Sequence, residues 1–304
     1  MSPRIRLGTA PDSWGVWHPA DPRQTPWNRF LDEVAAAGYQ WIELGPYGYL
    51  PTDPLRLLDE VAQRGLRISG QAVQVGLHRE GAFDRAVEDA KRVASLVEAV
   101  GASHLVMLPE MFRSTEDPYA QTQERTLDAE AWQRLTSGMT ALGKIVADDH
   151  GVRLAFHPHA DSHVESQAQV ERFLCDTEPD YVALCLDTGH VAYGGGDNVA
   201  LIDSYPDRIG YVHLKQVDPD VLDDVRAADL SFAEAVQAGV CTEPPAGVPE
   251  MRDVVSALAG LNIDLFAIVE QDLFPCDPDV PLPIARRTRR HLRACGLGPL
   301  GSGH

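Results

Sequence analysis

The sequence predicts an α/β protein in which strands and helices alternate along the whole chain. Short apolar runs are followed by longer helical patterns, eight times in succession, and no Gly-, Pro- or Ser-rich linker divides the 304 residues. Strict alternation implies a parallel sheet with right-handed crossovers. Eight units at this length favour one closed (β/α)8 barrel, or TIM barrel, spanning residues 1–304 as a single domain.

Each element follows from a local pattern. The expected strands are the apolar runs at residues 4–10, 39–44, 66–75, 103–109, 152–158, 182–190, 209–216 and 264–272. Thr25 is expected to cap a helix that has Pro26 in its first turn and ends at Gly38. Asp53 is expected to cap the next helix, which ends at Gly65. Further helices are expected at residues 82–101, 128–149, 165–175, 198–204, 251–261 and 284–294.

One connection is much longer than the others. The acidic segment 217–249 separates the seventh strand from its helix and contains the helical pattern DLSFAEAVQAGV. Long connections in compact domains are commonly functional. We therefore expect a small helical lid over the mouth of the barrel.

Composition restricts the function. The chain has 45 acidic and 26 basic residues and a net charge of −19, which disfavours nucleic acid or a membrane surface as partner. The basic run at 285–293 is interpreted as the solvated face of a terminal helix rather than a binding patch. Five scattered cysteines without a CxxC pair, and no signal-like segment, indicate a cytoplasmic protein with reduced thiols.

Polar residues gather where the last four strands end. Barrel enzymes carry their catalytic side chains at these positions. The strand ends supply His157 and His159, then Asp187 and His190, then His213 and Lys215, and finally Glu270, Gln271 and Asp272. Imidazoles and carboxylates that converge on one point suit a divalent ion such as manganese, cobalt, iron or zinc, and disfavour calcium. No cysteine falls at these strand ends, so a structural zinc site is not expected.

Simpler interpretations exist for the single residues. A lone histidine at a strand end is usually a hydrogen-bonded loop residue, and Asp187 before Thr-Gly could cap a turn. Trp14 and Trp17 follow the first strand and could line a sugar pocket or pack in the core. The metal interpretation depends on the coincidence of four consecutive strands, which chance rarely produces.

Several stretches resemble one family, in its order along the chain. They are AGYQWIELGPYGYLP at 37–51, FHPHAD at 156–161, LCLDTGHVAYGGGD at 184–197, YVHLKQV at 211–217 and IVEQD at 268–272. Together they resemble the xylose isomerase-like TIM barrel superfamily of sugar isomerases, epimerases and lyases, and within it the inosose dehydratases. The sequence departs from that branch at Gln216, where an aspartate is usual, and in its first strand.

The resemblance implies roles for individual residues. The metal ligands would be Asp187, His213 and Glu270, with His157 where many members have a glutamate. Alternatively, the ligand from the fifth strand would be His159 or Glu165. The catalytic acid and base would be His159 or Glu165, with His190 as a second group and Lys215 at the substrate carbonyl. The substrate-binding positions would be Glu43, Trp14, Gln71 and Gln271.

The resemblance also implies a reaction class. The cofactor would be a divalent ion, with manganese or cobalt preferred and zinc, iron or magnesium as alternatives. The enzyme would remove a proton next to the carbonyl of a small sugar or cyclitol, as an inosose dehydratase-like lyase. The alternative is a sugar or sugar-phosphate isomerase or epimerase. A homo-oligomer stays open. The acidic charge disfavours a DNA enzyme, and a non-catalytic sugar-binding barrel stays an alternative that loss of the metal would support.

Overall fold

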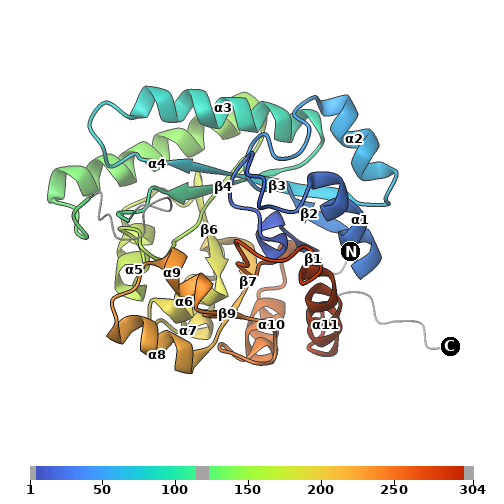
Figure 1. Cartoon of the computed structure of the whole chain (residues 1–304). Helices are drawn as coiled ribbons and strands as arrows, with labels where there is room; N and C mark the ends of the chain where they lie inside the picture. The colour runs from blue at the N-terminus through green and yellow to red at the C-terminus, as the bar shows by residue number, and fades with distance from the viewer. Residues whose placement is uncertain (1–4, 114–122, 298–304) are drawn as a thin grey trace.

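The computed structural model describes residues 5–113 and 123–297, which form a closed barrel of eight parallel strands (Figure 1). The strands in chain order are β1 (Ile5–Thr9), β2 (Trp41–Glu43), β3 (Arg67–Val75), β4 (His104–Pro109), β5 (Arg153–Phe156), β6 (Val182–Asp187), β7 (Ile209–Leu214) and β10 (Leu265–Val269). Around the barrel the order is β1-β10-β7-β6-β5-β4-β3-β2. The predicted (β/α)8 barrel is therefore confirmed.

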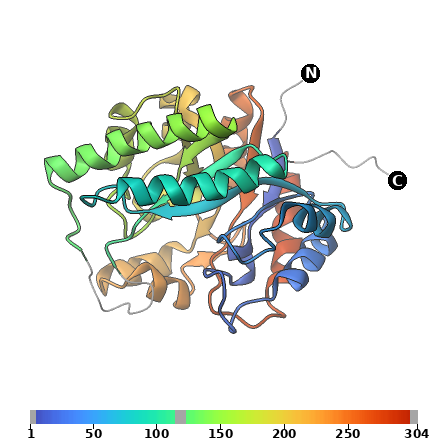
Figure 2. The same cartoon turned by 90° about the horizontal axis from the view of Figure 1, so that it is seen from above.

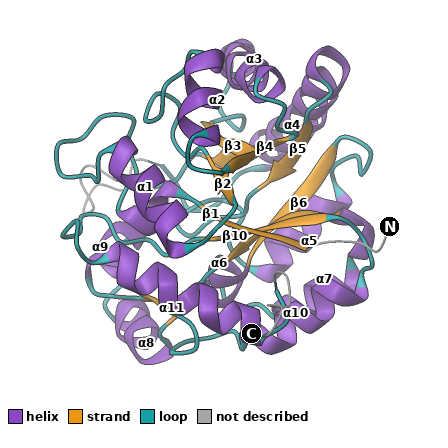
Figure 3. Cartoon of the chain, turned by 90° about the vertical axis from the view of Figure 1, so that its right-hand side faces the viewer, coloured by secondary structure: helices purple, strands orange, loops and turns teal. Residues whose placement is uncertain are grey.

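Helices surround the strands, as two further views show (Figures 2 and 3). They are α1 (Trp27–Ala37), α2 (Pro54–Ala62), α3 (Phe83–Ala99), α4 (Ala129–His150), α5 (Gln167–Cys175), α6 (Thr188–Tyr193), α7 (Asn198–Ser204), α10 (Met251–Gly260) and α11 (Pro281–Ala294). Every residue of β6, β7 and β10 is buried, because the barrel interior covers one face of the strands and the helices cover the other. No helix in the described part of the chain is long and apolar enough to cross a membrane.

The helix caps agree with the sequence in part. Asp53 accepts a hydrogen bond from the backbone of Arg56, and Gly38 ends α1 in the left-handed conformation, both as predicted. The prediction that Thr25 caps α1 is wrong. Pro26 takes the cap position with ψ of 142° and offers no side-chain acceptor, because its backbone stays extended and delays the helix by one residue.

The end of the sixth strand also differs from the prediction. Residues 188–190 were expected to continue the strand, but they open the short helix α6. Asp187 causes the change, because one of its carboxylate oxygens accepts hydrogen bonds from the backbone of Gly189 and His190. A capping aspartate of this kind starts a helix directly at the strand end.

The long segment 217–249 folds beside α6 (Figure 1). It begins within β8 (Gln216–Val217) and contains α8 (Pro219–Ala227), α9 (Phe232–Gln237) and β9 (Cys241–Thr242). Phe232 belongs to a small apolar cluster with Ala160 and Tyr193, so the segment packs on the loops at the barrel mouth. Movement of this segment as a lid stays a prediction.

Candidate metal centre and active site

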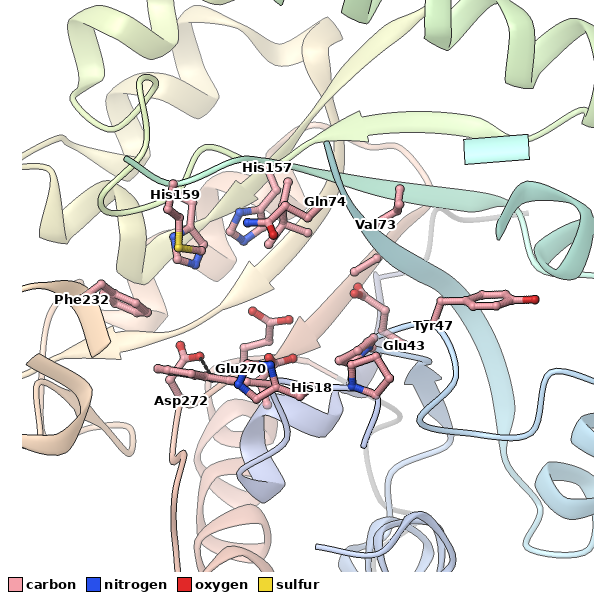
Figure 4. Close-up of a pocket in the computed structure, with 18 of the residues that line it drawn as sticks. His18, Glu43, Tyr47, Val73, Gln74, His157, His159, Phe232, Glu270 and Asp272 are labelled. Carbon is pink, nitrogen blue, oxygen red and sulfur yellow. Dashed lines mark hydrogen bonds between the residues drawn. The ribbon is translucent and has the colours of Figure 1, made fainter. Parts of the chain in front are cut away.

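Four side chains meet at the carboxyl end of the barrel. His157 follows β5, Asp187 ends β6, His213 lies in β7 and Glu270 follows β10. One donor atom from each lies within 4.8 Å of the others, and all four residues are buried. Because β10, β7, β6 and β5 are neighbours in the sheet, their ends lie side by side. Figure 4 shows His157 and Glu270 facing the same pocket.

Asp187 serves two structures with its two oxygens. Oδ1 caps α6, as described above, while Oδ2 lies 3.3 Å from His157 Nε2 and 3.2 Å from Lys215 Nζ. Burial opposes the charged form of this carboxyl, but Lys215 and His190 outweigh it and hold its pKa well below the usual range. Asp187 therefore presents a fixed negative oxygen to the other three side chains.

His213 is oriented by a carboxylate from the first half of the barrel. Its Nε2 donates a hydrogen bond of 3.0 Å to Glu43 Oε2, which fixes the tautomer because a carboxylate can only accept. Its Nδ1 has no hydrogen-bond partner in the described residues and lies 3.0 Å from Glu270 and 3.7 Å from Asp187. Burial opposes the charged imidazolium, but Cys185, Glu270 and Glu43 outweigh it and hold the pKa of His213 well above its usual range, so Nδ1 carries a proton beside the two carboxylates. A divalent cation would take the place of that proton among the same groups. The residues present therefore fit a metal ion.

The thiol of Cys185 lies close to His157 and His213. Cys185 Sγ, together with one nitrogen each of His157 and His213, forms a second group of donors within 4.8 Å. Strand ends alone do not reveal it, because Cys185 lies two residues before the end of β6. Burial raises the pKa of this thiol to about 12, whereas His213 and Lys215 outweigh burial and lower that of Glu270 to about 2. The charged donors at neutral pH are therefore the carboxylates.

Lys215 is enclosed by carboxylates. Its Nζ lies 2.7 Å from Asp272, 3.2 Å from Asp187 and 3.4 Å from Glu270, with 2% of the side chain exposed. Burial alone would neutralise the amine, but Asp187 and Asp272 outweigh it and raise the pKa well above the usual value. Lys215 lines the pocket and reaches it as an ammonium ion.

Two histidines with closely packed, tilted rings lie beside the centre. The rings of His159 and His190 are 3.9 Å apart, and Phe232 packs against both. His159 Nδ1 donates to the carbonyl of Ala160 at 2.7 Å, so its Nε2 carries the lone pair. Burial, with the charges of His157 and Lys215, lowers the pKa of His159 to about 3. This imidazole is therefore neutral at physiological pH.

These groups open into one cavity of about 500 Å³. Figure 4 shows Phe232 and Asp272 on one side of it and Glu43, Tyr47 and Val73 on the other. The size and the mixed apolar and polar lining are typical of a small-molecule site.

Three predicted substrate-binding residues do not line this cavity. Trp14 is fully buried in the core against Phe30 and donates to Glu33, because the turn after β1 points it inward. Trp17, three residues later, lines the cavity instead. Gln71 and Gln271 are buried, and their amide groups lie near the backbone carbonyls of Gly45 and Cys241. They support loops at the mouth.

Two predicted catalytic residues also lie outside the lining. Glu165 accepts a hydrogen bond from the backbone of Asp161, and burial followed by the charge of Asp161 raises its pKa to about 7. His190 lies behind His159 and accepts a hydrogen bond from Ala160 N. The resemblance suggested catalytic roles for both residues, but neither lines the pocket, because the turn after β5 directs Glu165 away from it.

Other lining residues were not predicted as site residues. Asp12 and Asp272 each lie three residues after the end of a strand, β1 and β10, so their position just beyond the strand ends was a usable signal. Trp17 Nε1 donates to Asp272 at 2.9 Å. Phe232 comes from α9, in the segment that was expected to cover the mouth, but the sequence does not indicate which of its side chains enters the pocket. Its position depends on how the segment 217–249 packs.

The fold and the site define a (β/α)8 barrel with imidazole and carboxylate donors at its mouth. A family model for the xylose isomerase-like TIM barrel matches residues 31–295. The chain belongs to this family.

Relatives agree with this assignment, and solved structures agree with the fold. The chain is 31% identical over 292 residues to an inosose dehydratase of Salmonella typhimurium, covering 95% of each, and 28% identical over 299 residues to one of Geobacillus thermodenitrificans, covering 97% and 98%. An L-ribulose 3-epimerase has a TM-score of 0.70 at 17% identity, covering 96% of this chain and 95% of that one. The IolI protein with a bound zinc atom has a TM-score of 0.65 at 16% identity, covering 96% of each.

Proposed function

We propose that this protein is a divalent-metal-dependent hydro-lyase that dehydrates inosose, a cyclitol ketone. The observation that carries the proposal is the buried set His157, Asp187, His213 and Glu270 at the barrel mouth. The choice of inosose as the substrate rests on the similarity to inosose dehydratases, one of which matches 95% of the chain. A bound ion would act as a Lewis acid on the ketone and stabilise the charge that develops on its oxygen.

The chain's own residues would move the protons. The lone pair at Nε2 of His159 takes the proton from the carbon next to the ketone, because this imidazole is neutral and lines the pocket. The Lys215 ammonium gives a proton to the β-hydroxyl, which leaves as water. Glu43 holds His213, and Trp17 with Asp272 holds Lys215. His190 and Glu165 support the loop after β5.

The substrate is a neutral polyol rather than a sugar phosphate. The cations at the pocket already contact carboxylates: Lys215 contacts three, Arg113 contacts Asp161 and Asp229, and Arg92 contacts Asp89. A phosphate group would have to displace these carboxylates from their cations. The displaced carboxylates would then be left without a cationic partner, which is unfavourable in a buried site.

The finer assignments are proposals on the same footing. Two nitrogen and two carboxylate donors suit manganese or cobalt, with zinc, iron and magnesium as alternatives. All five cysteines are unpaired, which is typical of the cytoplasm.

The test is a product assay. The chain is stripped of metal, reloaded with manganese, and incubated with inosose and with a panel of ketoses. We expect loss of water and an ultraviolet-absorbing dione from inosose alone, and no product from the metal-stripped protein. A new sugar of unchanged mass would instead identify an isomerase or epimerase and overturn the proposal.

A further inference from the structure

A second cavity lies at the opposite end of the barrel. It has a volume of about 840 Å³ and is lined by residues from β1, from the starts of β2 and β3, and from the carboxyl ends of α1, α10 and α11. These are the amino ends of the strands, away from the candidate metal centre. The cavity is therefore separate from the active site.

The charge of this cavity opposes that of the protein. Four arginines line it, Arg6, Arg67, Arg289 and Arg293, and no aspartate or glutamate is among the described lining residues. The whole chain carries a net charge of −19. The excess of arginine is therefore a local feature, and general composition does not explain it.

Two of these guanidinium groups lack an acidic partner. Within residues 5–113 and 123–297, neither Arg67 nor Arg289 makes a side-chain hydrogen bond or ion pair. Arg67 lies over the ring of Trp41, with its Cζ 5.6 Å from the ring centroid. Arg289 is half-buried, and burial together with the charge of Arg293 lowers its pKa. Arg67 is exposed to solvent, so the desolvation argument applies to Arg289, whose partly buried charge favours a bound anion.

The arginines are not needed to cap the neighbouring helices. The last carbonyls of α1 accept from Gly38 N and Tyr39 N, and those of α11 accept from Gly296 N and Leu297 N. Backbone donors thus satisfy the carbonyls of Val34, Ala35, Leu292 and Arg293 at these helix ends. The donors of Arg289 stay available to a ligand.

We propose that this cavity binds a small oxyanion of the phosphate type. Guanidinium groups offer paired N–H donors that match a phosphate, and Trp41 supplies an adjacent aromatic wall. Arg289 and Arg67 are the anchoring residues, while Arg6 is engaged with Asp264 at 2.8 Å. The basic run at 285–293 thus has two sides: Arg286 and Arg290 are exposed, and Arg289 faces the cavity.

The test is titration calorimetry of the metal-loaded protein with inorganic phosphate, at an ionic strength kept constant with sodium chloride. We expect saturable binding, weakened at least ~10-fold in Arg289→Gln and in Arg67→Gln, which corresponds to about 1.4 kcal/mol each. Arg286→Gln and Arg290→Gln make the same charge change on the exposed side of α11 and are expected to bind like the wild type.

Two results would overturn the proposal. One is the absence of saturable binding in the wild type. The other is equal affinity in all four variants, which would place any bound phosphate elsewhere, including at the metal. Binding that persists in Asp187→Ala would show that the cavity acts independently of the metal centre, so this test stands whether or not inosose is the substrate.

Discussion

The two halves of the barrel contribute differently to the site. In the second half, β5, β6, β7 and β10 each end in one of the four buried donors. In the first half, β2 ends in Glu43, which contacts the centre through His213, and β3 supplies the pocket wall at Val73. The second half therefore holds the donors, and the first half orients them and shapes the cavity. The four donors can meet because β10, β7, β6 and β5 are consecutive in the closed sheet.

The largest expected effect is in the second half. Asp187→Ala removes a charged donor and the cap of α6, so we expect loss of stoichiometric metal and at least a ~1000-fold loss of activity. Metal content by elemental analysis and turnover of inosose check this. Asp203→Ala, on the exposed side of α7, is the control. Full metal content in Asp187→Ala would show that Asp187 is not a metal ligand, and would contradict the division of roles between the two halves of the barrel.

Lys215→Met separates proton transfer from metal binding. The variant keeps the length of the side chain but removes the ammonium, so we expect about a 100-fold or greater fall in kcat. Its metal content should stay near that of the wild type. Lys144→Met, with 53% of the lysine side chain exposed on α4, should change neither. An unchanged kcat would exclude Lys215 from the chemistry.

Glu43→Gln tests what the first half contributes. The amide can still accept a hydrogen bond but no longer carries the charge that favours His213 Nε2–H. We expect metal affinity to fall ~10- to 100-fold, the usual effect of removing a partner that orients a ligand. Metal titration measures it, with Glu60→Gln on α2 as control. If affinity stays the same, the first half contributes only shape.

Glu165→Gln tests a carboxylate of the second half that faces away from the centre. Its pKa is about 7 in the folded protein against 4.5 when unperturbed, so the folded state binds more protons between these values. The wild type should therefore lose stability as pH rises from 4.5 to 7. Gln stays neutral, so the variant should be more stable by about 2 kcal/mol above pH 7 after allowance for partial exposure, and similar near pH 4. Thermal unfolding across pH measures the difference.

The sequence by itself determined the alternating architecture and the residue types at the strand ends. Period and length predicted the eight units, and Asp53 and Gly38 marked helix boundaries through local hydrogen bonding and backbone conformation. The donors on β5, β6, β7 and β10 could be predicted because a parallel barrel collects strand ends at one mouth.

Only the tertiary structure decided how those residues meet. Glu43 contacts His213 across 170 positions of sequence, and Trp17 rather than Trp14 reaches the pocket because of one turn after β1. The tertiary structure also decided that Arg289 faces the second cavity, because the packing of α11 determines which of its sides is turned toward the barrel. Local patterns specify which residues lie on a strand or helix, whereas contacts between distant segments depend on the geometry of the closed barrel.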